Sequence, residues 1–557
     1  MPYGIPHRHP RPTFRFLPLC RAATLVALFL AVSLVPPAWA AWPHGTLPVA
    51  LDDDIQILTG LVPDGKGGLF VMWTDAAPGS TQYDVFVQHF NNGGARTWGD
   101  HGVMAVPHPA GGIEPLSRMV SDGHNGVIVA AIYSNSRTLF NHLVVQRLGI
   151  SGNALWGSAG VDLGDALVAY PTLVSDDAGG AIVGFTPTVP SQFVAQHLGD
   201  DGTPLWSSPG ITPAPGGLSP QPYAVRDGAG GAIFAWTKSG TAATHVAQRV
   251  SGGGVSLWSA AGIPLPDYPR AIAETDGNGF VLAWYHVLLN QAQDMYMQKY
   301  DGSGSPVWAP AGVLVSHQMG VKSALELQPD GAGGVYASWA LRAFPDPTVS
   351  ILAQHLDASG TALWALYGAV AAPGQQITDQ HTMTPDGVGG LYVTFGSADP
   401  NSSIYLQRLA ADGSRAGPVE TPVLGYYGLG ASDARGNTFF GWATADNKAL
   451  VERRSTGRGQ DLLKVTAGQP LLAPLAAIEP NPARGAFRAV GSLPTNAPAE
   501  VELYDLRGRM VGSRQVVPVA GRWSAWFGEA DHLASGTYML RVIQGRAVSV
   551  AKLSLIR

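Results

Sequence analysis

The chain has 557 residues, of which 13% are charged, with 34 Lys and Arg against 40 Asp and Glu, a net charge of −6, and it contains 70 Gly and 43 Pro. This length exceeds what one hydrophobic core fills, so we expect two or more domains, and the turn-rich composition is typical of many short strands. The acidic balance disfavours nucleic acid and anionic membranes as partners.

The first 40 residues are predicted to form a secretory signal peptide. A basic segment without acidic residues precedes an apolar run over 22–35 and the small-x-small site Ala38-Trp39-Ala40. The run is short and wrongly flanked for a membrane span, although an uncleaved anchor is the alternative. We expect cleavage before Ala41, export, and no transmembrane segment in the mature chain. The basic residues of the predicted signal peptide are Arg8, Arg11, Arg15 and Arg21.

Loss of this leader would change both the charge and the thiol content. Without the four leader arginines, 30 basic residues stand against 40 acidic ones, a net charge of −10. Cys20, the only cysteine of the sequence, also lies in the leader. A mature chain without cysteine excludes disulfides, thiolate catalysis and cysteine-bound zinc.

A repeat with fixed internal spacing follows the leader. Seven times a glutamine precedes a glycine by six residues, and six copies continue as Gly-x3-Trp-x3-Gly. The seventh copy keeps Gln407 and Gly413 but has Gly417 in place of tryptophan. Self-similarity at a period near 50 residues predicts stacked supersecondary units. The six complete copies are Gln88/Gly94/Trp98/Gly102, Gln146/Gly152/Trp156/Gly160, Gln196/Gly202/Trp206/Gly210, Gln248/Gly254/Trp258/Gly262, Gln298/Gly304/Trp308/Gly312 and Gln354/Gly360/Trp364/Gly368.

Each unit also carries a turn that begins with aspartate, usually followed by glycine, which supplies the positive φ of a hairpin. A short apolar run follows the turn, and its β-rich composition predicts a fully buried strand. The turns begin at Asp64, Asp122, Asp176, Asp227, Asp276, Asp330, Asp386 and Asp433, and the clearest apolar runs are 69–73, 181–185, 232–236, 335–339, 391–395 and 439–442.

Four strands per unit predict the blade of a β-propeller: one before the turn, one after it, the glutamine strand and the tryptophan strand. The eighth unit lacks its tryptophan strand, and Trp42-Pro43-His44-Gly45 at the start of the mature chain offers one. Closure by that segment would hide the edge strands. We therefore expect an eight-bladed propeller over 42–458, within a domain of residues 41–458. A seven-bladed ring with one irregular unit is the alternative.

The stretches 300–308 and 356–364, which read YDGSGSPVW and LDASGTALW, resemble the tryptophan-docking motif of quinoprotein-type eight-bladed propellers. The resemblance implies that the repeat tryptophans pack between neighbouring blades. The vicinal cysteine disulfide of quinoprotein alcohol dehydrogenases is missing, and no acidic cluster clearly matches their calcium site. The motif thus favours the ring more than the redox chemistry.

The C-terminal segment 477–557, after a linker over 459–476, breaks the repeat. It contains, in order, the motifs 479–483 (EPNPA), 501–509 (VELYDLRGR), 533–541 (LASGTYMLR) and 552–555 (KLSL). This series of motifs resembles type IX secretion sorting domains and the immunoglobulin-like domain of flagellar hook-capping proteins. The resemblance implies a small immunoglobulin-like β-sandwich that engages the secretion machinery as an address or anchor, and alternating strands around two turns agree with this. A plain accessory sandwich is the alternative.

Signals of catalysis or metal binding are weak. The sequence has no His-Glu-x-x-His, Gly-x-Ser-x-Gly or P-loop motif. His89, His197 and His355 follow the repeat glutamine where other units have Arg or Lys, which predicts an exposed polar position rather than a metal site. The carboxylates of 52–54 suit calcium, although a solvated acidic loop is the simpler interpretation.

The strands before the turns are expected to line the central channel. Paired carboxylates with an arginine there would suit glycoside hydrolysis, but the residue types differ between units, and ordinary polar strand ends explain them. We therefore assign no catalytic, cofactor-binding or metal-binding residue. The channel candidates are Glu114, Arg118, Tyr170, Gln221, Arg270, Glu274, Glu326, Asp379 and His381.

The sequence therefore predicts an all-β, exported or cell-surface protein, in which a propeller acts as a binding or display module. Its partners would be an unknown protein or glycan and, through the C-terminal domain, the sorting machinery. No cofactor is expected, with calcium as the one candidate. The alternative functions are a secreted enzyme of polysaccharide or quinone-linked chemistry and a scaffold for an envelope assembly.

Overall fold

The computed structural model describes residue 42 and most of residues 46–555. The leader and Cys20 lie outside the described residues, as do Pro43–Gly45, Tyr170 and Gln221. One three-residue 3₁₀ turn, η1 (Asp276–Asn278), is the only helical element in the described part of the chain. Among the described residues, no helix has the length and apolarity to cross a membrane. The gaps are 53, 78–79, 81–82, 107–111, 136–140, 168–170, 190, 217–221, 239–243, 289–290, 345–347, 376, 398–402, 417–422, 434–435, 445, 456–476, 480–486, 493–497, 506–509, 519–521, 528–532 and 545–546.

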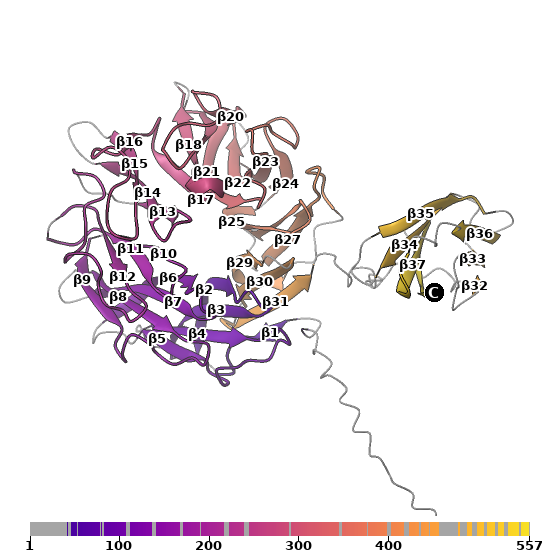
Figure 1. Cartoon of the computed structure of the whole chain (residues 1–557), viewed down its shortest axis with the longest axis horizontal. Helices are drawn as coiled ribbons and strands as arrows, with labels where there is room; N and C mark the ends of the chain where they lie inside the picture. Colours follow the sequence, from indigo (N-terminus) through magenta and orange to yellow (C-terminus); the bar gives the residue numbers. More distant parts are fainter. Residues whose placement is uncertain are drawn as a thin grey trace, which may run out of the picture. The chain divides into compact units, whose positions relative to one another are not determined.

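The strands described between residues 47 and 455 form eight antiparallel sheets arranged in a ring (Figure 1). One strand of each sheet lies innermost, and each of these strands contacts the inner strand of the next sheet. β29 contacts β2, so the described inner strands make a closed circuit, which is the fold of a β-propeller. The inner strands are β2 (Ile55–Pro63), β6 (Gly112–Ser121), β10 (Thr172–Ser175), β13 (Tyr223–Arg226), β17 (Pro269–Glu274), β21 (Gly320–Pro329), β25 (Ile377–Pro385) and β29 (Tyr426–Ser432).

The second strand of each sheet follows the aspartate turn and forms the core. The apolar runs predicted to be buried strands lie in these elements and are buried throughout, which confirms that prediction. Because both faces of each sheet pack against neighbouring sheets, these strands show continuous rather than alternating hydrophobicity. The second strands are β3 (Leu69–Ala76), β7 (Val127–Asn135), β11 (Ala181–Phe185), β14 (Ala232–Lys238), β18 (Phe280–Val287), β22 (Val335–Ala343), β26 (Leu391–Ser397) and β30 (Asn437–Ala443).

The third strand carries the repeat glutamine in seven of the eight sheets. The eighth sheet has Glu452 at the equivalent place, on β31. The third strands are β4 (Asp84–Phe90), β8 (Asn141–Leu148), β12 (Val194–Leu198), β15 (Thr244–Val250), β19 (Gln293–Tyr300), β23 (Val349–Leu356), β27 (Ser403–Leu409) and β31 (Ala449–Ser455).

The fourth strands are shorter than the sequence predicts. The tryptophan and the following glycine lie in the turn before the strand, as Trp308 and Gly312 precede β20, so the prediction that the strand carries them was wrong. The third sheet has three strands, and an isolated bridge between Ala195 and Ile211 occupies the place of a fourth. The fourth strands are β5 (Val103–Val106), β9 (Val161–Ala166), β16 (Ile263–Pro264), β20 (Val313–Ser316), β24 (Ala369–Gln375) and β28 (Val423–Leu424).

The fourth strand of the last sheet comes from the other end of the chain. β1 (Leu47–Pro48) pairs antiparallel with β31, with Leu47 opposite Val451. Trp42 is buried, and its ring centroid lies 5.6 Å from that of Phe90 and 5.7 Å from that of Phe439. The N-terminal segment thus packs between the first and last sheets.

The repeat glutamine holds the turn that carries the tryptophan. In the second sheet, Gln146 Oε1 accepts the backbone N–H groups of Arg147 (2.9 Å) and Trp156 (3.1 Å), and Nε2 donates to the Gly157 carbonyl (2.7 Å). Buried amides must find such partners, and a side chain ten residues before the tryptophan supplies them. The bond to the tryptophan N–H recurs from Gln88, Gln196, Gln248, Gln298 and Gln354.

Two further antiparallel sheets form the C-terminal part and enclose a core that includes Phe487, Leu503, Trp523, Phe527 and Leu540. Along β36 the buried residues Trp523, Ala525 and Phe527 alternate with exposed residues, so one face of that strand is buried. The strands are β32 (Ala477–Glu479), β33 (Phe487–Ser492) and β36 (Arg522–Phe527) in one sheet, and β35 (Met510–Val516), β34 (Ala499–Asp505), β37 (Gly536–Gln544) and β38 (Ala547–Leu555) in the other.

Candidate functional site

The residue after each repeat glutamine is buried or half-buried, not exposed, and the burial of His89, His197 and His355 corrects the prediction for these three histidines. His89 is 5% exposed and its Nε2 lies 3.1 Å from Asp64 Oδ2 in the turn of the same sheet. Histidine, arginine and lysine are interchangeable here because each reaches that turn carboxylate. The other pairs are Arg147–Asp122, His197–Asp176, Arg249–Asp227, Lys299–Asp276, His355–Asp330 and Arg408–Asp386.

Six of the eight turn aspartates therefore have two structural roles, as Asp64 shows. Asp64 Oδ1 accepts the backbone N–H groups of Lys66 (2.7 Å) and Gly68 (2.8 Å), while Oδ2 faces His89. Burial alone raises the pKa of Asp64, but the His89 and backbone hydrogen bonds outweigh it, so the pKa is lowered overall. These backbone bonds agree with the predicted turn that begins with aspartate, and the pairing with His89 is a second structural role.

A cavity of about 580 Å³ opens at the end of the ring where the aspartate turns lie. Seven of the eight inner strands contribute to it, and most of its lining is apolar. Cavities of roughly 300–1,000 Å³ with apolar walls and a few polar groups are the usual form of ligand sites. We call it the channel cavity; its lining includes Val62, Met119, Ser121, Leu173, Val174, Val225, Arg226, Ile272, Glu274, Leu327 and Ser432.

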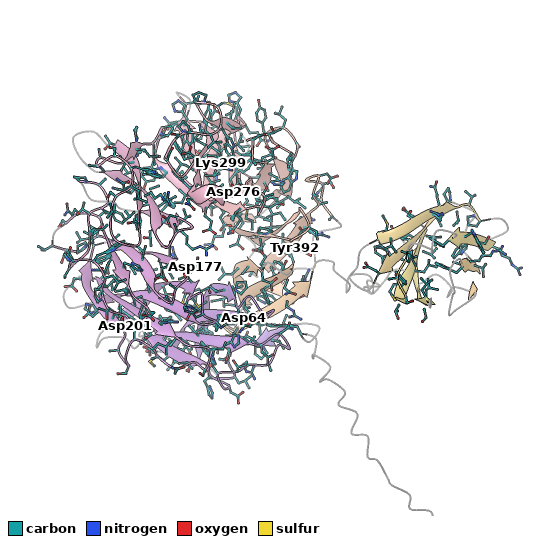
Figure 2. The ribbon with its side chains drawn as sticks, in the orientation of Figure 1. Asp64, Asp177, Asp201, Asp276, Lys299 and Tyr392 are labelled. Carbon is teal, nitrogen blue, oxygen red and sulfur yellow. The ribbon has the colours of Figure 1, made fainter. Side chains whose placement is uncertain are left out.

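Arg226 is the main polar feature of the channel cavity. Its Nε and Nη2 donate to the two carboxylate oxygens of Glu274 (2.9 and 2.5 Å), and Nη1 donates to Asp177 (2.9 and 3.0 Å). Asp177 lies towards the middle of the ring, whereas Asp201 lies at its outer edge (Figure 2). The guanidinium thus joins carboxylates from the two sheets on either side of its own, and the Glu274 hydrogen bond raises the pKa of Arg226.

Three of the other channel candidates, Glu326, Asp379 and His381, join neighbouring sheets rather than converge on one point. Glu326 Oε2 accepts the Met383 N–H (2.9 Å), and Asp379 Oδ2 accepts the Ser323 hydroxyl (3.2 Å). His381 contacts the Ser338 hydroxyl (2.9 Å). Arg270 lies over the rings of Tyr268 and Tyr285.

Four candidates give little evidence about chemistry. Arg118 donates to the adjacent Ser117 carbonyl (3.3 Å), and the structure describes only the backbone of Glu114, on β6. Tyr170 and Gln221 lie outside the described residues.

Glu326 and His381 are electrostatically unusual. Burial raises the pKa of Glu326 to about 7 and lowers the pKa of His381. His381 also lines a second cavity of about 470 Å³, with Leu58, Thr59 and Phe395 among its other residues. A carboxyl group that titrates near neutrality suits general acid–base chemistry.

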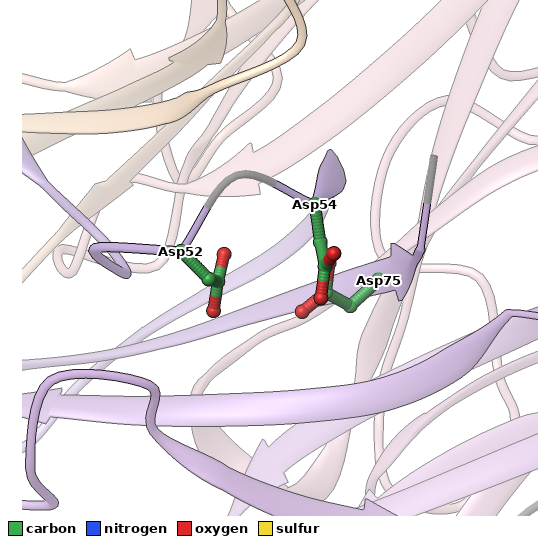
Figure 3. Close-up of side chains that lie close together, drawn as sticks. All are labelled: Asp52, Asp54 and Asp75. Atoms are coloured by element: carbon green, nitrogen blue, oxygen red, sulfur yellow. The ribbon is translucent and has the colours of Figure 1, made fainter. Parts of the chain in front are cut away.

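An acidic cluster lies at the other end of the first sheet, away from its aspartate turn. Asp52, Asp54 and Asp75 each offer an oxygen, and these atoms lie within 4.8 Å of one another. In Figure 3 the Asp54 side chain points towards that of Asp75, with Asp52 beside them. The calcium candidate of the sequence thus acquires Asp75, at the end of β3, while Asp53 lies outside the described residues.

Sequence reasoning missed Arg226 and Asp75. Arg226 directly precedes the Asp227 turn, at the end of an inner strand, and that position was the available signal. Asp75 stands two residues after the aromatic that ends the buried run, where six of the other seven sheets have Pro187, Lys238, His286, Leu341, Ser397 or Thr444. An acidic residue in one unit alone marks a local role, but only the structure places it beside Asp52 and Asp54.

No family model matches the chain, and no curated protein matches it. Among solved structures it is similar to the β-propeller domain of the trilobed protease from Pyrococcus furiosus, with 10% identity over 66% of this chain and 95% of that one, and a TM-score of 0.38. It is also similar to prolyl oligopeptidase B from Galerina marginata, with 10% identity over 88% of this chain and 55% of that one (TM-score 0.36). A third likeness is to the Hadza microbial sialidase Hz136, with 12% identity over 59% of this chain and 76% of that one (TM-score 0.31). The ring of sheets described above is an all-β repeat fold.

Proposed function

We propose that this protein is an exported or cell-surface binding module whose ligand enters the channel cavity of an eight-bladed propeller. In this proposal the eight sheets are the blades, the repeat tryptophans dock each blade on the next, and β1 completes the last blade. The C-terminal sheets form an immunoglobulin-like sorting or anchoring domain.

The channel cavity carries the binding proposal. Its volume of about 580 Å³ accommodates a small ligand or one or two side chains of a protein partner. Its apolar lining favours an apolar group, and the partly exposed Arg226–Glu274–Asp177 set offers hydrogen bonds to a peptide or sugar at the rim. Because these three side chains already bond one another in the free protein, they can orient a ligand without the entropy cost of ordering them on binding.

Filling the cavity tests this proposal. Ser121 is exposed in the lining, so Ser121→Trp would place an indole in the channel, whereas Val189→Trp adds the same group at a residue that is 84% exposed. The full chain is screened by thermal shift against defined peptide and glycan panels. We expect at least one peptide or glycan to raise the melting temperature of the wild type. Ser121→Trp should abolish this shift, and Val189→Trp should preserve it. A ligand that still raises the melting temperature of Ser121→Trp would bind elsewhere, and the channel cavity would be rejected as the site.

An enzyme acting on polysaccharide is a second candidate, favoured by Glu326. Its pKa of about 7 is suited to a general acid, and Asp379 lies on the neighbouring inner strand β25. Glu326→Gln would then abolish glycan cleavage without loss of binding. Retained cleavage by that variant would exclude this role.

The role of the C-terminal domain is tested separately. Deletion of residues 477–557 should leave the propeller folded but retain it inside the cell envelope, as fractionation and immunoblotting would show. Release of the truncated protein at the level of the full chain would reject the sorting role.

A further inference from the structure

The acidic cluster has a buried oxygen that the rest of the fold does not use. Asp75 is 5% exposed, and its Oδ1 has no hydrogen-bond partner among the residues that the structure describes. An unpartnered carboxylate oxygen in the interior costs free energy, because water no longer solvates it. The oxygen belongs to the same group as those of Asp52 and Asp54, so a cation placed there would satisfy it.

The surrounding strands concentrate negative charge at this point. Asp75 on β3 stands opposite Asp84 on β4 and opposite Gln56 on β2. Directly opposed residues in an antiparallel pair have Cβ atoms about 4.5–5.5 Å apart, so Asp84 adds a like charge to the same row.

Among the described residues, neighbouring donors bond some of the oxygens of the cluster. Asp52 Oδ1 accepts a bond from Gln56 (2.5 Å), and Asp52 Oδ2 lies 3.1 Å from His101 Nδ1. The Lys448 ammonium contacts the backbone carbonyls of Asp52 and Asp54 rather than their carboxylates. Each carboxylate oxygen has a second lone pair, so these contacts leave room for a metal.

The cluster also lies where the first and last sheets meet. Residues 52–54 connect β1, which belongs to the last sheet, to β2, which begins the first. Lys448 precedes β31, and the Ala449 N–H donates to Gln56 Oε1 (3.0 Å). A ligand that fixes residues 52–54 to Asp75 would therefore hold this junction, which we call the closure seam.

We propose that Asp52, Asp54 and Asp75 bind one calcium ion, which fastens the closure seam. Calcium takes six to eight oxygen ligands at roughly 2.3–2.6 Å and accepts irregular geometry, so three carboxylates and water suit it. A divalent cation would also relieve the repulsion within the cluster. This site does not depend on the ligand of the channel cavity.

Calcium titration of the full chain, freed of metal with a chelator, tests the proposal by calorimetry. We expect one saturable site in the wild type. Asp75→Asn and Asp54→Asn should each weaken calcium binding by about tenfold or more. Asp201→Asn removes a fully exposed turn carboxylate instead and should bind calcium as the wild type does.

Hydrogen exchange locates the effect. Calcium should slow amide exchange in peptides that cover β1, β2 and β31 in the wild type and Asp201→Asn, but not in Asp75→Asn. Without calcium, Asp75→Asn should melt no lower than the wild type because it removes a repulsion, so a loss of binding would not reflect misfolding. Absence of saturable binding, or equal binding by Asp75→Asn, would overturn the proposal.

Discussion

The indole Nε1 of Trp98 donates a 2.8 Å hydrogen bond to the backbone carbonyl of Ile150, which belongs to the next sheet of the ring. Two residues later comes Gly152, where an added Cβ would lie 3.0 Å from the Trp98 ring. One tryptophan thus needs both a carbonyl and a bare glycine from its neighbour, which explains the unvarying spacing of the repeat. The relationship recurs for Trp156 with Asp200 and Gly202, Trp206 with Gly252 and Gly254, Trp258 with Gly302 and Gly304, Trp308 with Ala358 and Gly360, and Trp364 with Ala411 and Gly413.

Gly152→Ala should destabilise the propeller by about 2–3 kcal/mol, measured by denaturant unfolding. Gly152 has φ +81°, which costs an L-residue roughly 1–2 kcal/mol, and the new methyl would also displace the Trp98 ring. Gly99 has φ +77° with no atom within 4 Å of the added Cβ, so Gly99→Ala isolates the backbone cost. Equal losses in the two variants would show that tryptophan contact does not constrain Gly152.

Most of the repeat architecture could be predicted because it depends on local chemistry. The positive φ of the turn glycines and the continuous apolar run of each second strand are visible in single segments of sequence. The spacing from glutamine to tryptophan was also visible, but its cause was not, since Gln146 acts through three backbone contacts made only after the turn forms. The burial of His89 was missed for the same reason, because its partner Asp64 lies 25 residues earlier.

Arg453→Met should loosen the closure seam. Arg453 Nη1 donates to the carbonyls of Gly67 (2.8 Å) and Asn92 (3.0 Å) of the first sheet, and the guanidinium lies 5.2 Å from the Trp42 ring. Hydrogen bonds to a charged group contribute about 1.5–3 kcal/mol, and methionine keeps most of the packing.

Hydrogen exchange should accordingly speed up in β1 and β31 of Arg453→Met, with a loss of about 2 kcal/mol in local stability. Arg454→Met is the matched control, because Arg454 bonds Glu452 within its own strand. Unchanged exchange in Arg453→Met would mean that strand pairing alone holds the seam.

The candidate sites were harder to predict than the ring. The inner strands were placed correctly, yet which of their residues share a cavity depends on strand stagger and on neighbouring sheets. Arg226 bonds Asp177, 49 residues before it, and Glu274, 48 residues after it. Such contacts span about one repeat in each direction, so no local pattern reports them.

His197→Gln should move acid unfolding to a higher pH. Burial raises the pKa of Asp176, but the His197 and backbone hydrogen bonds outweigh it and leave the pKa below its usual 3.8. Asp176 therefore contributes stability above pH 3.8 that is lost as the pH falls through the folded pKa. Without the His197 hydrogen bond the pKa of Asp176 is higher, so this stability is lost at a higher pH. The midpoint of an acid titration followed by circular dichroism checks this.

The partly exposed histidine His142, which pairs with Asp162 and Asp165, supplies the control. His142→Gln should leave the acid midpoint unchanged. If both variants shift it equally, net charge rather than the Asp176 pair controls acid stability.

Glu326→Gln should flatten the dependence of stability on pH between about 4.5 and 7. Burial raises the pKa of Glu326 from 4.5 to about 7, so in this window the unfolded chain loses a proton that the folded chain keeps. Stability therefore falls as the pH rises, by roughly 3 kcal/mol at most between the two pKa values. Glutamine does not titrate, and its carbonyl oxygen still accepts the Met383 N–H.

Urea unfolding of the propeller at several pH values checks this prediction. The free energy of unfolding should fall more steeply with pH in the wild type than in Glu326→Gln. Glu500→Gln, at an exposed carboxylate of β34, should leave this slope unchanged for the propeller transition. Parallel curves for the wild type and Glu326→Gln would show that Glu326 titrates normally, which would also remove the observation favouring an enzyme.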